Sequence, residues 1–222
     1  MNLNCSLLRS WLPVKKKPLL LIFLCLFLPI FQSVSGADNH LAAMKSTGLL
    51  YFGTAPDYIP FTFYDKTGEP DGLDIALIKE IGSRMGVTIE IVDLAYDGLL
   101  DAARIRQVDL IGGALTRTEE NTGQIDFSRA YYRGSGKFIT LAERNTDLLT
   151  SVEQLSDSRI AVQRGTNFEQ WLWTNLVASA IIPNGNIETY STPADAMAAL
   201  DSHETDFVLL DQFTYERHFS SS

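Results

Sequence analysis

The chain has 222 residues, with 18 basic and 27 acidic side chains and a formal net charge of −9. This acidic balance argues against a nucleic-acid-binding protein and against a protein that binds anionic lipid surfaces. The length is enough for one large domain or two small lobes.

The N-terminal segment, residues 1–37, has the layout of a secretory signal peptide. Basic residues precede an apolar run at residues 19–31, and small residues follow it. We expect cleavage after Gly36 or Ala37 and therefore a periplasmic protein. The run is shorter than a membrane-spanning helix, so retention as an anchor is the less favoured alternative.

Cleavage at this point would change the composition of the protein. Residues 1–37 contain four basic residues, no acidic residue and both cysteines, Cys5 and Cys25. The mature chain would carry a formal net charge of −13 and would have no thiol for a disulfide or a metal site.

Strands and helices are predicted to alternate in the first half of the mature chain. Residues 49–54 and 87–92 have the composition of strands, and residues 109–113 predict a third. A helix with its inward face at Leu73, Leu77, Ile78, Ile81 and Met85 is predicted between the first two, ending at Gly86. A short helix with Leu99, Leu100 and Ala103 inward follows the second strand.

The second half repeats this alternation. Strands are predicted at residues 159–163, 186–190 and 207–210, with helices at residues 167–178 and 193–200 between them. Phe168, Trp171, Leu172 and Leu176 form the inward face of the first of these helices. Alternation of this kind predicts mostly parallel sheets covered by helices.

Capping signals support several helix starts. Thr166 with Glu169, and Thr150 with Glu153, have the spacing of a capping box, and Thr192 precedes a proline at a first helical position. Between the halves, residues 130–140 form an extended aromatic and glycine-containing stretch. We interpret this stretch as a crossover between two lobes, and residues 211–214 as a second crossover.

Four segments resemble, in order, the family 3 extracellular solute-binding proteins, the periplasmic amino-acid-binding components of ABC importers. They are residues 53–61 (GTAPDYIPF), 72–77 (GLDIAL), 108–118 (VDLIGGALTRT) with its continuation to Tyr132, and 160–166 (IAVQRGT). Each string alone is weak. The four together, spread over residues 47–215, are specific.

The resemblance implies a type II periplasmic-binding-protein-like α/β fold. Each of two lobes would be a mixed, mostly parallel sheet flanked by helices, joined by a two-strand hinge that closes over a solute. We expect lobe 1 at residues 38–133, with residues 213–222 returning to it, and lobe 2 at residues 134–212. Family members continue beyond this point to complete lobe 1. We therefore expect a fragment, a truncated product or a shortened variant whose lobe 1 exposes apolar surface and has low stability.

Open α/β sheets bind ligands beyond the carboxyl ends of their strands, so the residues just past each strand are candidates. Tyr58 follows the first strand, where its ring could stack on the solute or pack beside its neighbours. Tyr96 lies where the family often places a second aromatic wall, although surface packing explains it equally well.

Past the third strand, Gly113, Ala114, Thr116 and Thr118 lie at the start of a helical turn whose free amides favour a carboxylate. The family normally adds an arginine here that holds the carboxylate of the solute by a bidentate contact. This chain has Asn121 at the matching position, and asparagine replaces neither the charge nor the planar fork. Arg117 could substitute if it faces the cleft, or it could be a solvated surface residue.

In lobe 2, Thr166 and Asn167 open a helix after a strand, where capping alone or capping with ligand binding would explain them. Asp211 ends an apolar strand, which is a costly position for an unpaired carboxylate. The family uses an acid at this position to bind the ammonium group of the solute. We favour that role over a structural ion pair, so the solute is expected to be an amine or a relative of an amino acid.

No metal site is predicted, because the three histidines are scattered without ligand spacing. No catalytic residue or cofactor is predicted either, because nothing in the sequence resembles a nucleophile elbow, a phosphate-binding loop or a pair of catalytic carboxylates. Three functions remain. The favoured one is a solute receptor that delivers a small polar solute to an ABC permease in the cytoplasmic membrane. The second is the sensor module of a membrane signalling receptor. The third is a module of an enzyme such as a lytic transglycosylase, or a dehydratase of the same fold.

Overall fold

The computed structural model describes residues 36–144 and 149–220. The predicted signal peptide therefore lies outside the described residues except for Gly36 and Ala37, which begin helix α1 (Gly36–Thr47). The sequence analysis did not predict α1. The predicted cleavage site remains a prediction.

Within the described residues, no helix is both long enough and apolar enough to cross a lipid bilayer.

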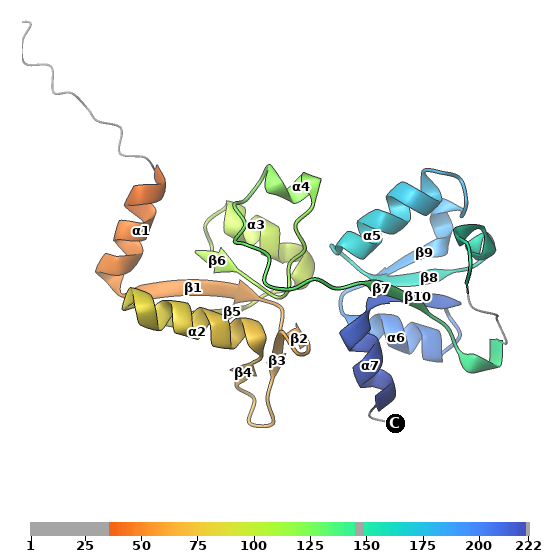
Figure 1. Ribbon diagram of the computed structural model, residues 1–222, viewed down its shortest axis with the longest axis horizontal. Coiled ribbons are helices and arrows are strands. Elements are labelled where there is room, and N and C mark those ends of the chain that lie inside the picture. The colour runs from red at the N-terminus through yellow and green to blue at the C-terminus, as the bar shows by residue number, and fades with distance from the viewer. Residues whose placement is uncertain (1–35, 145–148, 221–222) are drawn as a thin grey trace, which may run out of the picture. The chain divides into compact units, whose positions relative to one another are not determined.

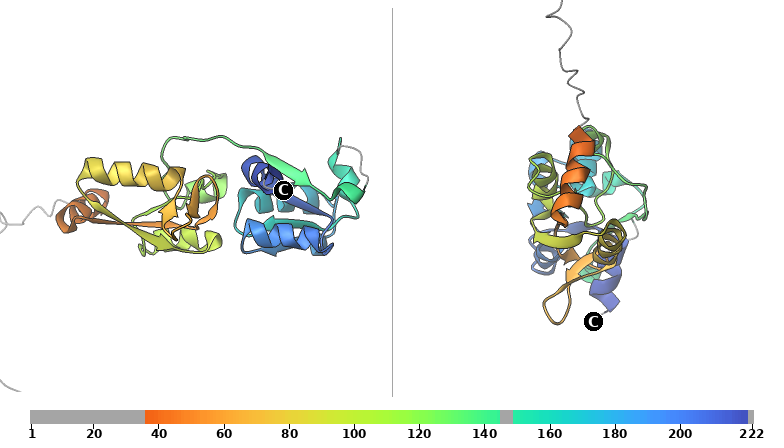
Figure 2. Two further views of the ribbon diagram at one scale, coloured as in Figure 1. Left: turned by 90° about the horizontal axis from the view of Figure 1, so that it is seen from below. Right: turned by 90° about the vertical axis from the view of Figure 1, so that its left-hand side faces the viewer.

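Lobe 1, as we name it, is built on a parallel sheet with the strand order β5-β1-β6. The sequence predicted all three strands, β1 (Leu49–Thr54), β5 (Thr88–Asp93) and β6 (Leu110–Ile111). Helix α2 (Leu73–Met85) connects β1 to β5 and runs alongside β1, in yellow in Figures 1 and 2. The 3-10 turn η1 (Tyr96–Gly98) and helix α3 (Leu99–Arg104) connect β5 to β6.

A small antiparallel sheet lies between β1 and α2 in the sequence. Its strands are β2 (Asp57–Tyr58), β3 (Thr62–Tyr64) and β4 (Pro70–Asp71). The sequence analysis did not predict these short strands, which have too few residues for an alternating pattern. They place Asp57 and Tyr58 directly beyond the carboxyl end of β1.

The core of lobe 1 differs from the predicted one at α2. Ile75 and Ile78 are buried against Leu50 and Phe52 of β1. The predicted inward residues Leu73 and Leu77 are instead 49 % and 41 % exposed, so that part of the prediction was wrong.

The helix is turned this way because of a glycine. A Cβ atom at Gly82 would lie 2.6 Å from the side chain of Ile89 on β5, so only glycine lets α2 pack this closely on the sheet. The face that carries Gly82 is therefore the face that meets the sheet. Elsewhere in lobe 1, Tyr51, Ile105 and Leu110 are exposed apolar side chains.

Lobe 2 is built on a second sheet with the strand order β7-β10-β8-β9. Strands β8 (Ile160–Gln163), β9 (Ile187–Tyr190) and β10 (Phe207–Asp211) are parallel, and the edge strand β7 (Gly136–Ile139) is antiparallel to β10. The prediction of mixed, mostly parallel sheets flanked by helices is therefore confirmed (Figure 1).

Helices cover both faces of the lobe 2 sheet. Helix α5 (Asn167–Leu172) and the π-helical turn η4 (Trp173–Val177) pack Leu172 and Leu176 on Ile160 and Val162. Helix α6 (Pro193–Asp201) packs on Ala161 and the alternate residues of β10. Adjacent residues of a strand point to opposite faces, so these are two separate cores. Trp171, predicted to be inward, is 39 % exposed.

Two of the three predicted helix caps are confirmed, and the third is displaced by one residue. The hydroxyl oxygens of Thr166 and Thr192 accept hydrogen bonds from backbone amides three residues later, as predicted. The box predicted at Thr150 is displaced by one residue, because Ser151 caps the 3-10 turn η3 (Val152–Leu155) with Gln154 as its partner. Two further 3-10 turns are η2 (Ala142–Arg144) and η5 (Asn184–Asn186).

The segment after β10 is helical. Helix α7 (Gln212–Ser220) begins directly at the end of the strand, where the sequence analysis expected a crossover. Residues 123–135, by contrast, lead into β7 without regular structure, as expected of a connection between lobes. The exact lobe boundaries at residues 133 and 212 remain predictions.

Candidate functional site

The strongest candidate site is a cavity of about 340 Å³ that is lined by residues of both lobes. The segments that line it are η1, helix α3, the loop after β6, helix α4 (Glu119–Thr122) with Gln124 after it, the loop after β8 and helix α5 with η4. Most of these segments lie just past the carboxyl ends of parallel strands, the position expected for a ligand site in an open α/β sheet. The lining residues are Tyr96, Asp97, Leu100, Leu115, Thr116, Thr118, Glu120, Asn121, Gln124, Gly165, Thr166, Asn167, Glu169, Gln170 and Trp173.

The cavity brings together half of the residues that the sequence predicted as ligand-binding. Those that line it are Tyr96, Thr116, Asn121, Thr166 and Asn167. Those that lie outside its lining are Tyr58, Gly113, Ala114, Arg117 and Asp211. A ligand role for any of the ten stays a prediction.

Sequence reasoning missed the acidic side chains of the cavity, Asp97, Glu120 and Glu169. Each lies next to a predicted position or, for Glu169, was interpreted only as a partner of a helix cap. The sequence could have indicated them. Three acidic residues close to candidate positions are unusual for a site that is expected to bind a carboxylate, because like charges repel.

Two polar contacts cross from lobe 1 to lobe 2 at the cavity. The side-chain nitrogen Nε2 of Gln170 donates a hydrogen bond to Glu120 Oε2 over 2.7 Å. Arg164 Nη1 lies 3.6 Å from Asp97 Oδ2. The backbone approaches closely here, since a Cβ atom at Gly165 would lie 2.9 Å from the Cα of Asp97. Gly165 has a φ of +78°, a conformation that favours glycine.

Asn121 is buried and holds the turn that carries Thr116. Its side-chain oxygen accepts from the amide of Thr118 over 2.8 Å, and its side-chain nitrogen donates to the carbonyl of Thr116 over 2.8 Å. Thr118 in turn caps α4 by accepting from the Asn121 amide. Asn121 therefore has a structural role in this chain.

The amides of Gly113 and Ala114, predicted to meet a carboxylate of the solute, bond to a carboxylate of the protein. Both donate to Asp74 Oδ2, over 2.7 and 2.8 Å, and the hydroxyl of Tyr131 donates to the same oxygen over 2.9 Å. Asp74 is 3 % exposed. It therefore joins the loop after β6 to the connection between the lobes.

Asp211 and Tyr58 meet outside the cavity. Asp211 is buried and caps α7. Its carboxylate accepts hydrogen bonds from the backbone amides of Phe213 and Thr214 and from the Thr214 hydroxyl. Burial raises the pKa of Tyr58, and its hydrogen bond to Asp211 raises it further. The ring of Tyr58 stacks on Phe61 at 5.0 Å between centroids. Arg117 is exposed.

Asp57 is a partly buried carboxyl group that the sequence analysis did not single out. Its Oδ2 accepts from Gln163 Nε2 of lobe 2 over 3.2 Å, and its Oδ1 is buried without a hydrogen-bond partner. Burial raises its pKa to about 6, with smaller contributions from the negative charges of Asp93 and Asp195. Burial also raises the pKa of Tyr96, and the charge of Asp57 adds to this.

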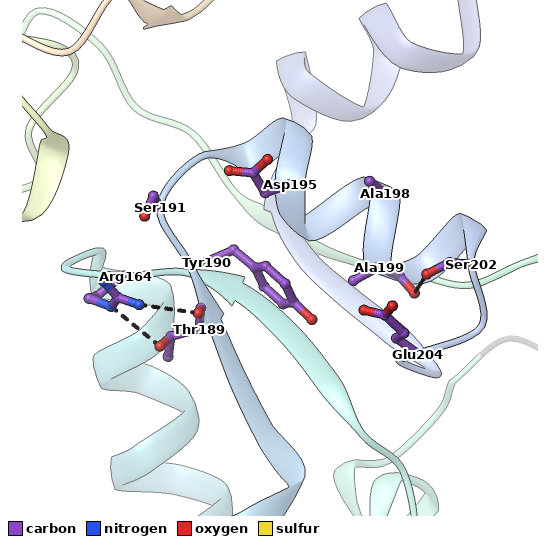
Figure 3. A pocket seen from close by; sticks show the side chains of 9 residues that line it. All are labelled: Arg164, Thr189, Tyr190, Ser191, Asp195, Ala198, Ala199, Ser202 and Glu204. Atoms are coloured by element: carbon purple, nitrogen blue, oxygen red, sulfur yellow. Dashed lines mark hydrogen bonds between the residues drawn. The ribbon is translucent and has the colours of Figure 1, made fainter.

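A second hollow lies on lobe 2 between β9 and α6 (Figure 3). Arg164, just past the end of β8, lies at one side of it and donates to Thr189 over 3.4 Å. Only lobe 2 residues line this hollow, and none of the predicted ligand-binding residues is among them. The cavity between the lobes is therefore the better candidate. Across the described residues, no three His, Cys, Asp or Glu side chains are grouped as a metal site would require.

Comparison with protein families identifies the chain. Residues 50–214 match the model of the bacterial extracellular solute-binding proteins, family 3. The chain belongs to this family. The match covers both lobes and includes every segment that lines the cavity.

Individual relatives in the family bind amino acids, according to their names. The chain is 30% identical to the "Probable histidine-binding protein" of Campylobacter jejuni over 88% of this chain and 72% of the relative. It is 25% identical to the arginine-binding extracellular protein ArtP of Bacillus subtilis, over 94% of this chain and 78% of the relative.

Solved structures agree with the family assignment. The arginine-bound, truncated ArgBP of T. maritima is 28% identical to this family 3 protein, with a TM-score of 0.72 over 82% of each chain. The ancestral amino acid-binding protein AncCDT-1, a precursor of cyclohexadienyl dehydratase, is 30% identical, with a TM-score of 0.72 over 82% of this chain and 78% of that one. Both support the two-lobed fold.

Proposed function

We propose that this family 3 protein captures a small polar solute, an amino acid or a related amine, in the cavity between its lobes. The observation that carries the proposal is a cavity lined by segments that follow the carboxyl ends of strands in two separate sheets. A solute in this position contacts both lobes at once, so its binding free energy favours the closed arrangement. The names of the relatives support an amino acid or a similar compound.

The solute is proposed to pass to an ABC permease in the cytoplasmic membrane. The family relationship supports this role over the sensor and enzyme alternatives. An importer component acts outside the cytoplasmic membrane, and the sequence of residues 1–37 favours the periplasm. Cell fractionation tests the location: the protein should be released with the periplasmic contents and should not remain in the membrane pellet.

A thermal-shift screen tests solute capture. The purified protein is heated with single amino acids, polyamines, opines and small carboxylates, because a ligand that binds only the folded state raises the midpoint. We expect at least one compound to give a concentration-dependent increase. Tyr96→Ala, in the cavity, should abolish the increase, while Tyr51→Ala, which removes an exposed tyrosine outside it, should leave it intact.

The screen also separates binding from catalysis. We propose that the protein releases its solute chemically unchanged, as an importer component requires. Mass spectrometry of the bound compound after prolonged incubation should recover the starting material. Conversion of the compound at a rate that Tyr96→Ala abolishes would instead identify an enzyme.

A further inference from the structure

Arg164 lies between the cavity and the hollow of lobe 2. It lines the hollow but is not among the residues that line the cavity, and its side chain is 49 % exposed. The residue directly follows β8, and its backbone nitrogen donates to the carbonyl of Tyr190 on β9 over 2.8 Å. A residue in this position can act on the cavity only through another side chain.

Lobe 2 orients the guanidinium of Arg164. Two of its nitrogens, Nε and Nη2, donate to the hydroxyl and the carbonyl oxygen of Thr189 on β9, each over 3.4 Å (Figure 3). The third nitrogen, Nη1, lies 3.6 Å from Oδ2 of Asp97 in lobe 1. A guanidinium is planar, so fixing two of its nitrogens also fixes the direction of the third. The positive charge is therefore held toward Asp97 by contacts within lobe 2.

Asp97 lies where the backbones of the two lobes come closest at the cavity. It is part of η1, and a Cβ atom at Gly165, the residue after Arg164, would lie 2.9 Å from its Cα. Glycine is the residue that permits such a close approach. Separation of the lobes would end this approach and the ion pair together, because each joins one residue of lobe 1 to one of lobe 2. The ion pair therefore belongs to the closed arrangement alone.

We propose that Arg164 and Asp97 form a latch between the lobes, and that Arg164 is a positioning residue that slows solute release without contacting the solute. This inference rests on the proposed function. An interaction made only in the closed arrangement favours that arrangement, and it must break before the solute leaves. Both side chains are partly solvated, so the expected effect on the dissociation rate is about two- to fivefold.

Dissociation rates of wild type and Arg164 variants test the latch. The probes are the compounds that raise the midpoint in the thermal-shift screen, starting with L-arginine and L-histidine. Trp173 lines the cavity, so stopped-flow fluorescence follows their release after dilution. Arg164→Gln should release every probe faster by the same factor, because the residue contacts none of them. Arg164→Lys keeps the charge but loses the fork that Thr189 orients, and should release the probes nearly as fast as Arg164→Gln.

Arg159→Gln is the matched control. Arg159 Nε lies 3.7 Å from Asp206 Oδ2, and the arginine side chain is 46 % exposed, but both residues of this pair belong to lobe 2. Its loss should change the dissociation rate by less than about 1.5-fold, because no contact between the lobes is removed. An equal acceleration by Arg159→Gln and Arg164→Gln would overturn the latch, since loss of a positive charge would then be sufficient.

A double-mutant cycle assigns the effect to the pair. Asp97 lines the cavity, so Asp97→Asn changes the site as well as the latch. In an Asp97→Asn background, Arg164→Gln has no ion pair left to remove and should change the dissociation rate by less than about 1.5-fold. An undiminished effect in that background would overturn the pairing of Arg164 with Asp97. Thermal unfolding of each variant shows that the folded state is retained.

Ionic strength gives a readout that a purely structural role of Arg164 would not change. Salt screens a solvated ion pair, so the ratio of the Arg164→Gln rate to the wild-type rate should fall toward one between about 50 and 500 mM NaCl. A ratio that does not change with salt would overturn the ion pair as the cause. Equal rates for wild type and Arg164→Gln at low salt would overturn the latch and leave solute capture standing. Binding of no screened compound by the folded protein would overturn both.

Discussion

Three aspartates, of which Asp74 and Asp211 are buried and Asp57 is partly buried, differ in how far the protein compensates their carboxylates. Asp74 accepts three hydrogen bonds at one oxygen, and Asp211 accepts three from the start of α7. Each therefore has three donors within the protein, which stabilise its charged form, although the second oxygen of Asp74 is buried without a partner. Asp57 accepts one side-chain bond and has a pKa of about 6. Its ionised carboxylate therefore lowers the stability of the folded state.

Substitution of Asp57 by asparagine should stabilise the solute-free protein. The pKa of Asp57 in the folded state is raised from 3.8 to about 6, so the folded state binds the proton more tightly than the unfolded chain. This group therefore lowers the free energy of unfolding as the pH rises from about 4 to about 6. At pH 7, Asp57→Asn should raise the free energy of unfolding by about 1 to 3 kcal/mol, measured by urea denaturation.

The increase in the free energy of unfolding that Asp57→Asn gives should be smaller at pH 4.5, where Asp57 is already largely protonated in the folded state. Asp74→Asn provides the matched control, because it replaces an oxygen that three donors need, and it should destabilise the protein at pH 7. A loss of stability at pH 7 in Asp57→Asn would contradict the argument that this carboxylate is uncompensated.

At the scale of elements, local sequence patterns located the strands and helices better than their faces. Thr166 and Thr192 cap their helices as the spacing predicted, because a cap involves only residues within one turn. On α2, Ile78, Ile81 and Met85 face the core as predicted, whereas Leu73 and Leu77 do not. Helical spacing allows two overlapping faces, and the close contact of Gly82 with Ile89 selects between them.

The loop after β8 gives a prediction at this scale. Gly165→Ala would place a Cβ atom 2.9 Å from Asp97 in a backbone conformation with a φ of +78°. The two walls of the cavity would have to separate, so we expect solute binding to weaken at least tenfold and the free energy of unfolding to fall by about 1 kcal/mol. Gly185→Ala, where no atom lies within 4 Å of the added Cβ, should change neither solute binding nor the free energy of unfolding. Calorimetry and urea denaturation of both variants check this.

For the whole molecule, the hydrophobic cores are separate. The core of lobe 1 joins β1, β5 and α2, and the two cores of lobe 2 share no buried residue with it. The described tryptophans, Trp171 and Trp173, both lie in lobe 2. Their fluorescence therefore reports on lobe 2 alone, while far-ultraviolet circular dichroism reports on both lobes.

Solute binding should couple the lobes. In a Trp11→Phe background, we expect the fluorescence and circular dichroism transitions to differ in midpoint without solute and to coincide with it. At a free solute concentration of 100 times Kd, the stabilisation should be about 2.7 kcal/mol. Transitions that coincide without solute would show that the lobes already unfold as one unit, contrary to this expectation.

The sequence by itself determined the alternating elements, the mixed parallel sheets, most of the caps and the family, because each follows from periodicity or short motifs. Half of the ligand-binding residues that it predicted line the cavity, since the ends of strands can be inferred from the pattern. Only the tertiary structure decided which carboxylates are compensated. Gly113 and Tyr131 donate hydrogen bonds to Asp74 across sequence separations of 39 and 57 residues. Gln163 donates to Asp57 across a separation of 106 residues. Such pairs depend on how whole elements pack, and no local pattern specifies them.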